Sequence, residues 1–463
     1  MKKNFVRIMI ANMITLVIGV VTNFLLPKYL SFESYAHVKT YALYLTYAGF
    51  FSLGYNDGMY LKYGGKELKE VDEKSFGSNF SNYSLLILLM FIIVLTVGII
   101  LKDNVVIAFA FGVFSYNELG YLKSFYQATG EFKSYANTLN IEKILIFIFN
   151  IILIFIFKSD NSNYYIWVQV LTGIVICLYL SIKLNNRLHF IKYSKFSIIE
   201  MIENIKSGFV LMLGNFSSGV FTGIDRWFIK IFLTSVSFAK YSFAASLENI
   251  INVFTTPITI SMYNYFCKKP QVEQIKKLKS ISLMWGTVVI AIAYPAKFVL
   301  EHYLTKYSSV SNIIFILFAT QVFNIIVKGI YVNIYKSQKK QKKYLLQMLL
   351  MLVIATSLDF IFIKLFNSMI LVAIATLLTT FIWFMTCELE KNNKIRFCLN
   401  EHIYLFAVLC IYLFTGYRLS PIAGLFTYAL LVLLLSLLLM NKTSIYLINT
   451  TKKIIIKRIK HNN

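Results

Sequence analysis

Apolar stretches of about 20 residues recur along the whole chain, separated by short connectors that are rich in lysine. A helix of this length is what a chain needs to cross the hydrocarbon core of a bilayer. The pattern therefore predicts an all-α polytopic membrane protein. About fourteen transmembrane helices are expected, at residues 6–27, 36–56, 80–101, 104–123, 136–157, 164–183, 207–233, 240–265, 281–301, 309–335, 344–366, 368–388, 398–417 and 422–440.

The apolar pattern repeats itself within the chain. Asn12 aligns with Asn215 at an offset of 203 residues, and the stretch YQATGEFKSY at 126–135 resembles YKSQKKQKKY at 335–344. Chance similarity between apolar helices is the alternative, but polar positions match as well. Because each repeat holds six helices, an even number, both copies would share one orientation and be related by a pseudo-two-fold axis along the membrane normal. The expected parts are an N-terminal lobe at 1–195, a C-terminal lobe at 207–395, two further helices at 398–440 and a basic cytoplasmic tail at 441–463.

Composition and charge agree with this pattern. Hydrophobic residues make up 58% of the 463 residues, and the formal net charge is +25. In a soluble protein such a charge would suggest nucleic acid, but here about 33 of the 46 lysines and arginines fall in the connectors on one side of the membrane. That side is the cytoplasm by the positive-inside rule. The sequence thus predicts a multi-pass membrane protein with both termini cytoplasmic and no nucleic-acid partner.

Polar side chains also follow helix faces inside the predicted spans. One such stripe runs from Gln321 through Asn324 and Lys328, and related stripes include Asn12 and Asn215. These side chains cannot favourably face lipid. Hydrogen bonds within a static bundle are one explanation, and the lining of a hydrated cavity is the other. Ionised groups on several stripes favour the cavity.

Three stretches carry a resemblance to a known family: LPKYLSFESYAHVKTY, LGYNDGMYLKYGGK and DRWFIKIFLTSVSFAKYSFAAS. The chain resembles, over its whole length, the bacterial polysaccharide flippases. These are the O-antigen and capsule repeat-unit transporters of the multidrug/oligosaccharidyl-lipid/polysaccharide exporter superfamily. The resemblance implies a V-shaped pair of lobes that opens alternately to the two sides. It also implies transport of an undecaprenyl-pyrophosphate-linked oligosaccharide from the inner to the outer leaflet. A polysaccharide polymerase and a coupling ion, H⁺ or Na⁺, are further candidate partners.

A pyrophosphate-linked sugar needs cations and hydrogen-bonding groups along its path. The candidate substrate-binding residues are Lys328, Arg226, Lys143, Asn215, Asn12 and Asn324. The candidate ion-coupling or gating residues are Asp57, Glu118, Asp225, Glu248 and Asp359. A structural ion pair is the alternative for Arg226, and compensation by the neighbouring Glu142 is the alternative for Lys143.

No enzyme, cofactor or metal centre is expected. No GxxxxGK[ST] motif is present, and the five histidines are dispersed without a metal-binding or triad pattern. Two rival functions remain. A cation-coupled multidrug exporter of the same superfamily would have a net acidic cavity. A membrane-embedded polymerase or glycosyltransferase would need catalytic loops outside the membrane, and the predicted outer loops, such as KSDNSN at 158–163, are short.

Overall fold

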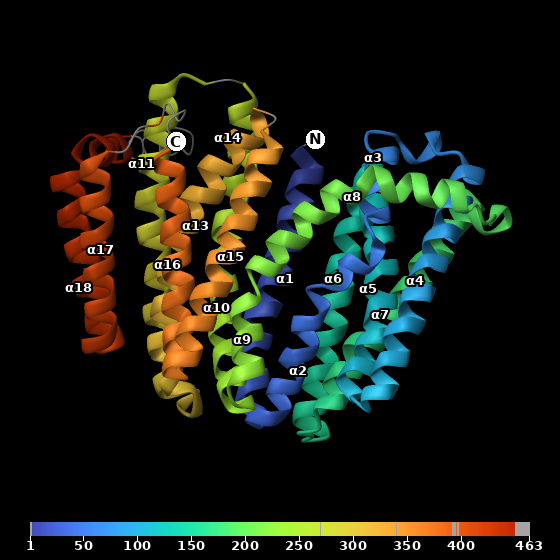
Figure 1. Cartoon of the computed structure of the whole chain (residues 1–463), viewed down its shortest axis with the longest axis horizontal. Helices are drawn as coiled ribbons and strands as arrows, with labels where there is room; N and C mark the ends of the chain where they lie inside the picture. The colour runs from blue at the N-terminus through green and yellow to red at the C-terminus, as the bar shows by residue number, and fades with distance from the viewer. Residues whose placement is uncertain (1, 269, 339, 391–394, 396–397, 450–463) are drawn as a thin grey trace, which may run out of the picture. The chain divides into compact units, whose positions relative to one another are not determined.

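The computed structural model describes residues 2–268, 270–338, 340–390, 395 and 398–449. Side chains are described within these ranges except at 2–14, 249, 252–254, 256–261, 263–264 and 341. Every regular element in the described ranges is a helix (Figure 1). The chain divides into two compact units, Met1–Arg226 and Trp227–Asn463.

The first unit is built from long helices joined by short turns. Its elements are α1 (Lys2–Tyr29), α2 (Phe32–Leu45), η1 (Ala48–Ser52), α3 (Tyr55–Tyr63), η2 (Leu68–Glu70), α4 (Glu73–Leu101), α5 (Asn104–Ala128), α6 (Phe132–Ile151), η3 (Ile152–Ile156), α7 (Ser162–Leu188), η4 (Phe190–Tyr193) and α8 (Ile198–Phe221). Short polar side chains begin several of these helices. Asp72 and Asp103, for example, accept hydrogen bonds from free backbone N–H groups in the first turns of α4 and α5.

Helix α5 lies at the centre of this unit, where it packs against α4, α7, α2 and α3. Aromatic side chains fill the space around it. Tyr83 and Tyr121 stack with ring centroids 4.5 Å apart, and Phe76 and Phe125 lie 4.3 Å apart. The opposite surface of α4 stays exposed and apolar, as a lipid-facing helix requires. The unit therefore has an aromatic core on one side of α4 and a surface suited to lipid on the other.

The predicted helix at 36–56 is not continuous, which corrects the sequence interpretation. After α2 the chain forms the short helix η1, passes through Leu53 and Gly54 with φ of +49° and +87°, and begins α3. Gly54 is needed there for two reasons. Only glycine adopts this conformation without strain, and a Cβ atom at Gly54 would lie 2.7 Å from the backbone nitrogen of Phe209 in α8. The break thus lets α3 pack directly against α8.

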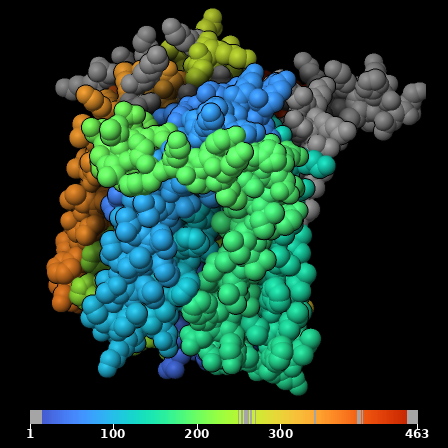
Figure 2. All heavy atoms as spheres, turned by 90° about the vertical axis from the view of Figure 1, so that its right-hand side faces the viewer, coloured from blue at the N-terminus to red at the C-terminus, as the bar shows by residue number. Residues whose placement is uncertain are grey.

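The first part of α8 lies across the end of α4 and is visible as a band in Figure 2. Glu200 fixes it there: its carboxylate accepts hydrogen bonds from Lys62, Ser78 and Asn79 at 3.2, 2.5 and 2.8 Å. The opposite face of the helix is apolar and exposed, with Ile199 73% accessible. A helix with one anchored polar face and one exposed apolar face is typical of a segment at a membrane interface.

The second unit contains the remaining helices. They are α9 (Ile224–Phe232), within which the division between the units falls, α10 (Ser235–Cys267), α11 (Val272–Val289), η5 (Ile290–Ile292), α12 (Ala293–His302), η6 (Thr305–Val310), α13 (Ser311–Ile326), η7 (Val327–Tyr331), α14 (Val332–Ser337), α15 (Gln341–Phe366), α16 (Met369–Glu388), α17 (Leu399–Arg418) and α18 (Pro421–Leu439). Helix α13 is the central one, in contact with α16, α10, α11 and α17. The element η7 is a π-helical segment that continues α13.

Ten helices in the described residues are long and apolar enough to cross a membrane, or eleven if the pair α8 and α9 counts as one span. That pair is bent by 50°, so the predicted helix at 207–233 is broken as well. The protein is therefore an all-helical, multi-pass membrane protein. The count of fourteen, the domain limits and the symmetry between two lobes stay predictions.

Candidate functional site

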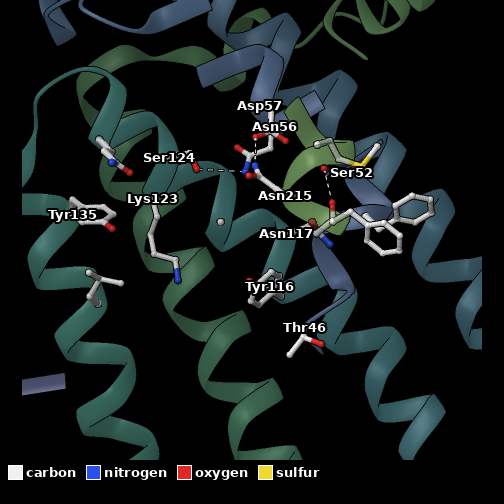
Figure 3. A pocket seen from close by; sticks show the side chains of 17 residues that line it. Thr46, Ser52, Asn56, Asp57, Tyr116, Asn117, Lys123, Ser124, Tyr135 and Asn215 are labelled. Atoms are coloured by element: carbon white, nitrogen blue, oxygen red, sulfur yellow. Dashed lines mark hydrogen bonds between the residues drawn. The ribbon is translucent and has the colours of Figure 1, made fainter. Parts of the chain in front are cut away.

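A polar pocket of about 420 Å³ lies within the first unit (Figure 3). It opens among α3, α5, α6 and α8 next to the break after α2. Its lining residues are Thr46, Gly49, Phe50, Ser52, Asn56, Asp57, Tyr116, Asn117, Gly120, Lys123, Ser124, Gln127, Tyr135, Leu139, Met212, Asn215 and Phe216. Amide, hydroxyl and charged groups dominate this lining, in a unit whose outer surface is apolar.

Two hydrogen bonds cross the pocket between elements that are distant in sequence. The Asn215 amide of α8 donates to the Asp57 carboxylate of α3 at 3.3 Å. The Asn56 amide donates to the Ser124 hydroxyl of α5 at 3.4 Å. The structure thus brings together Asn215 and Asp57, which the sequence had placed on separate predicted helices.

Lys123 is the cation of the pocket. Its ammonium lies 3.0 Å from the Glu142 carboxylate of α6, and both side chains are about four-fifths buried. The alternative given for Lys143 was compensation by Glu142, but Glu142 contacts Lys123, and Lys143 is exposed. Sequence reasoning missed Lys123 because it is the last residue of the predicted helix at 104–123, where a lysine is expected to reach the interface. In the structure α5 continues to Ala128, so Lys123 lies a full turn inside it.

The acid and guanidinium of α9 are close together. The Asp225 carboxylate accepts a hydrogen bond from the backbone N–H of Arg226 at 2.7 Å and lies 4.0 Å from the guanidinium Nε. Nη2 of Arg226 donates to the Thr222 carbonyl at 3.0 Å. Lys39 of α2 is near enough for its charge to interact with Arg226. Asp225 and Arg226 are therefore in contact, and Lys39 lies close enough to act on the charge of Arg226.

A second polar position lies in the other unit. From Ile313 to Asn333 all residues are buried except Asn324 and Lys328, which are half-buried and one turn apart. Glu248 of α10 accepts hydrogen bonds from the side chains of Gln321 and Thr320, and its charge interacts with Lys328. Lys328 belongs to the π-helical segment η7, a type of distortion that is frequent at functional sites.

Two of the remaining predicted residues, Glu118 and Asp359, are not among the described side chains that line the pocket. Glu118 faces the core of the first unit, where it is 2% exposed and its Oε1 atom has no hydrogen-bond partner among the described residues. Asp359 is buried in α15. The side chain of Asn12 lies outside the described residues. No group of three or more metal-ligating side chains occurs in the part of the chain that the structure describes.

Comparison with known proteins identifies the family. The family of polysaccharide biosynthesis proteins matches residues 1–269, which is more than half of the chain. The chain belongs to this family. A sequence search of the curated proteins found no match for this polysaccharide biosynthesis protein.

Two solved structures share the fold of this polysaccharide biosynthesis protein. The lipid II flippase MurJ in an inward closed conformation is 18% identical, with a TM-score of 0.71, and the match covers 94% of this chain and 99% of that one. A multidrug resistance MATE family transporter in an inward-facing conformation is 13% identical, with a TM-score of 0.60, covering 80% of this chain and 93% of that one. Both similar structures are membrane transporters rather than enzymes.

Proposed function

We propose that this polysaccharide biosynthesis protein is a flippase. It moves an undecaprenyl-pyrophosphate-linked oligosaccharide from the inner to the outer leaflet of the bacterial inner membrane by alternating access. The product serves the synthesis of O-antigen, capsule or exopolysaccharide. The observation that carries the proposal is the polar pocket with Lys123 inside a lipid-facing helical unit, in a member of this family.

The chemistry of the pocket suits such a substrate. Sugar hydroxyls need donors and acceptors, which Asn56, Asn117 and Asn215 supply together, and sugar rings pack against aromatic faces such as that of Tyr116. A pyrophosphate needs cations in a position that excludes bulk water. Lys123 is one such cation. The lipid tail has no need of a pocket, since it can stay in the bilayer.

The further cations have roles in the same proposal. Lys328, with Asn324 beside it, contacts the pyrophosphate in the second unit, and Arg226 does so from α9. Asp57 and Glu248, each bound to an amide side chain, are gating groups, as are Asp225, Glu118 and Asp359. Lys143 and Asn12 stay candidate substrate-binding residues in this proposal.

The proposal includes a topology. Fourteen spans form two six-helix lobes, at 1–195 and 207–395, followed by two helices at 398–440. Both termini lie in the cytoplasm, as the distribution of lysine and arginine favours. Helix α8 (198–221) begins between the proposed lobes and packs against α3 and α4. In this proposal it is the segment of the chain that leads from the first lobe to the second.

A multidrug exporter is the second candidate. Asp57 in the pocket and the fold shared with a MATE transporter favour it. An organic cation would seek Asp57, whereas a pyrophosphate would avoid it and seek Lys123. The two functions thus predict opposite charge preferences for the same pocket.

Reconstituted vesicles test the proposal. The purified chain is placed in liposomes that contain a fluorescent undecaprenyl-pyrophosphate disaccharide, and a membrane-impermeant quencher reports how much of it changes leaflet. We expect protein-dependent exchange of this lipid and none of a cationic dye. Dye transport without lipid exchange would instead support the exporter.

Variants of the Lys123–Glu142 ion pair separate an effect on stability from an effect on transport. Lys123→Met alone should destabilise the protein by about 3 kcal/mol, because it leaves the Glu142 carboxylate without its partner. The double variant Lys123→Met/Glu142→Met should recover most of the thermal stability, because no charge is left without a partner. It should still flip the lipid at least about 10-fold more slowly than the wild type, because the cation that binds the pyrophosphate is missing. A double variant that flips at the wild-type rate would remove Lys123 from the substrate path.

A further inference from the structure

The segment η7, which carries Lys328, has one extra residue in its turn. The backbone N–H of Val332 donates to the carbonyl oxygen of Val327, five residues back, whereas an α-helix makes this bond four residues back. Helix α13 before the segment and α14 after it are therefore out of phase by one residue, which is about 100° around the helix axis. If η7 became an ordinary α-helix, one of these flanks would have to turn by that angle. The direction of the Lys328 side chain thus depends on the contacts that hold the two flanks.

The flank before η7 is held by two neighbouring helices. Gln321 of α13 donates a hydrogen bond to the Glu248 carboxylate of α10. The ring of Phe323 contacts two rings of α16, with its centroid 5.5 Å from those of Phe381 and Phe384. A turn of α13 would break these contacts, so this flank is fixed.

The end of η7 is held by a carboxylate that is itself fixed. Tyr331, the last residue of η7, is 1% exposed, and its hydroxyl donates to Oε1 of Glu388, the last residue of α16. The Lys279 ammonium of α11 lies 2.6 Å from Oε1 and 2.7 Å from Oε2 of Glu388, and 2.9 Å from the Glu401 carboxylate of α17. Separation of a buried ion pair is costly. Glu388 is therefore a rigid anchor for the Tyr331 hydroxyl.

A further contact supports the middle of the segment. The side-chain amide of Asn333, which is buried in α14, donates to the carbonyl oxygen of Gly329 at 2.9 Å. Around this segment the residues are packed: every residue from Ile313 to Asn333 is buried except Asn324 and Lys328. The π-helical turn therefore directs the Lys328 side chain to the one side that is only half-buried.

We propose that Glu388 is a positioning residue for Lys328. Through the Tyr331 hydroxyl it holds the end of η7 and keeps the extra residue in the turn. The Lys328 ammonium then stays where it can meet a phosphate group of the substrate, while Glu388 acts through Tyr331 and not on the substrate. The part of Lys328 in pyrophosphate binding rests on the proposed function.

Hydrogen exchange of the full chain in detergent tests the anchor without any transport assay. Tyr331→Phe removes one hydroxyl group and keeps the ring, so the packing of η7 is preserved. The backbone amides of 328–332 should exchange at least about tenfold faster than in the wild type, because the contact to Glu388 is lost. If Tyr331→Phe does not fold, Glu388→Gln takes its place, since an amide oxygen is a weaker acceptor than a carboxylate. Exchange of these amides at the wild-type rate would overturn the anchor.

Tyr428→Phe is the matched control. Tyr428 of α18 is 2% exposed, and its hydroxyl donates to the carbonyl oxygen of Thr287 at 2.7 Å. This variant also removes a buried tyrosine hydroxyl from the second unit, but from a bond that does not include η7. It should leave the exchange of the η7 amides unchanged. Faster exchange at η7 in both variants would show a general loss of packing and would overturn the specific role of Glu388.

Acylation of lysines separates positioning from stability. The folded proteins are treated with an N-hydroxysuccinimide ester, and mass spectrometry compares the acylation rate of Lys328 with that of the exposed Lys364 in the same molecule. Tyr331→Phe should lower the relative rate for Lys328 several-fold, because the other directions around η7 are packed. General loosening would raise this rate instead. An unchanged or faster rate would overturn the positioning role.

Flipping in vesicles then connects the anchor to transport. Tyr331→Phe should flip the fluorescent lipid about tenfold more slowly than the wild type, and Tyr428→Phe should flip it at the wild-type rate. Wild-type flipping by Tyr331→Phe would overturn the link to transport. If the wild type flips no lipid at all, the proposed function fails, while exchange and acylation still decide whether Glu388 positions Lys328.

Discussion

Lys328→Glu should slow the flipping of a lipid-linked oligosaccharide about 100-fold in reconstituted vesicles. A hydrogen bond to a charged group contributes about 1.5–3 kcal/mol, and about 1.4 kcal/mol corresponds to a tenfold change in rate. The substituted carboxylate would also repel both the pyrophosphate and Glu248, whose charge interacts with Lys328. The expected loss therefore lies near the upper end of that range.

The position of Lys328 explains why it is the residue to test. In the described segment from Ile313 to Asn333, every residue is buried except Asn324 and Lys328, which are half-buried. A lysine within the span costs about 2.5–3.5 kcal/mol on insertion scales, so its presence there calls for a ligand or partner. Lys328→Arg keeps the charge and should keep most of the activity, whereas Lys328→Met should lose it.

Lys364→Glu is the matched control. Lys364 is exposed in the last turn of α15, where its ammonium lies 5.2 Å from the ring centroid of Phe232. This variant makes the same charge change away from the polar stripe and should flip at the wild-type rate. Thermal midpoints of all variants show whether they are folded. A folded Lys328→Glu protein with wild-type flipping would contradict phosphate recognition by this residue.

Gly208→Ala should destabilise the first unit by about 3 kcal/mol, at the upper end of the usual cost of overpacking. A Cβ atom at Gly208 would lie 2.0 Å from the carbonyl oxygen of Gly54 and 2.3 Å from the backbone nitrogen of Gly58. Both neighbours are backbone atoms, which cannot rotate away as a side chain can. The methyl group would therefore push α3 and α8 apart, next to the pocket that both helices line.

Gly214→Ala, in the same helix, is the control for this substitution. Nothing lies within 4 Å of a Cβ atom at Gly214, and alanine favours the helix by roughly 0.5–1 kcal/mol over glycine. Thermal unfolding of the detergent-solubilised variants should give a lower midpoint for Gly208→Ala and an unchanged or higher one for Gly214→Ala. Equal midpoints for the two variants would show that the α3–α8 contact tolerates a side chain.

Membrane insertion and the helical class followed from the sequence, because hydropathy over about 20 residues is a local property of the chain. The all-helical, multi-pass character of the described residues agrees with that expectation. The break at Gly54 and the 50° bend between α8 and α9 did not follow from it. Both spans read as continuous apolar runs, and the reason for the first break is the approach of another helix, which hydropathy cannot report.

The chemistry of the candidate sites was predictable only in part. Helical periodicity identified Asn215, Asn324 and Lys328 as members of polar stripes on their helices, since the face of a helix is set by its own residues. Their partners were not predictable in the same way. Glu142 binds Lys123 rather than its chain neighbour Lys143, because the side chains of adjacent helical residues point about 100° apart.

The buried ion cluster of Lys279, Glu388 and Glu401 shows most clearly what only the tertiary structure decided. In the sequence, Lys279 ends a basic connector, CKKPQVEQIKKLK, and Glu388 and Glu401 lie near the ends of the predicted helices 368–388 and 398–417, so none of the three was singled out. In the structure Lys279 and Glu388, 109 residues apart, are in contact and buried. The sequence by itself determined that the chain spans a membrane and on which helix faces its polar groups lie. The packing of helices from distant parts of the chain decided which charges meet and which are removed from water, because burial and pairing depend on neighbours that no local pattern specifies.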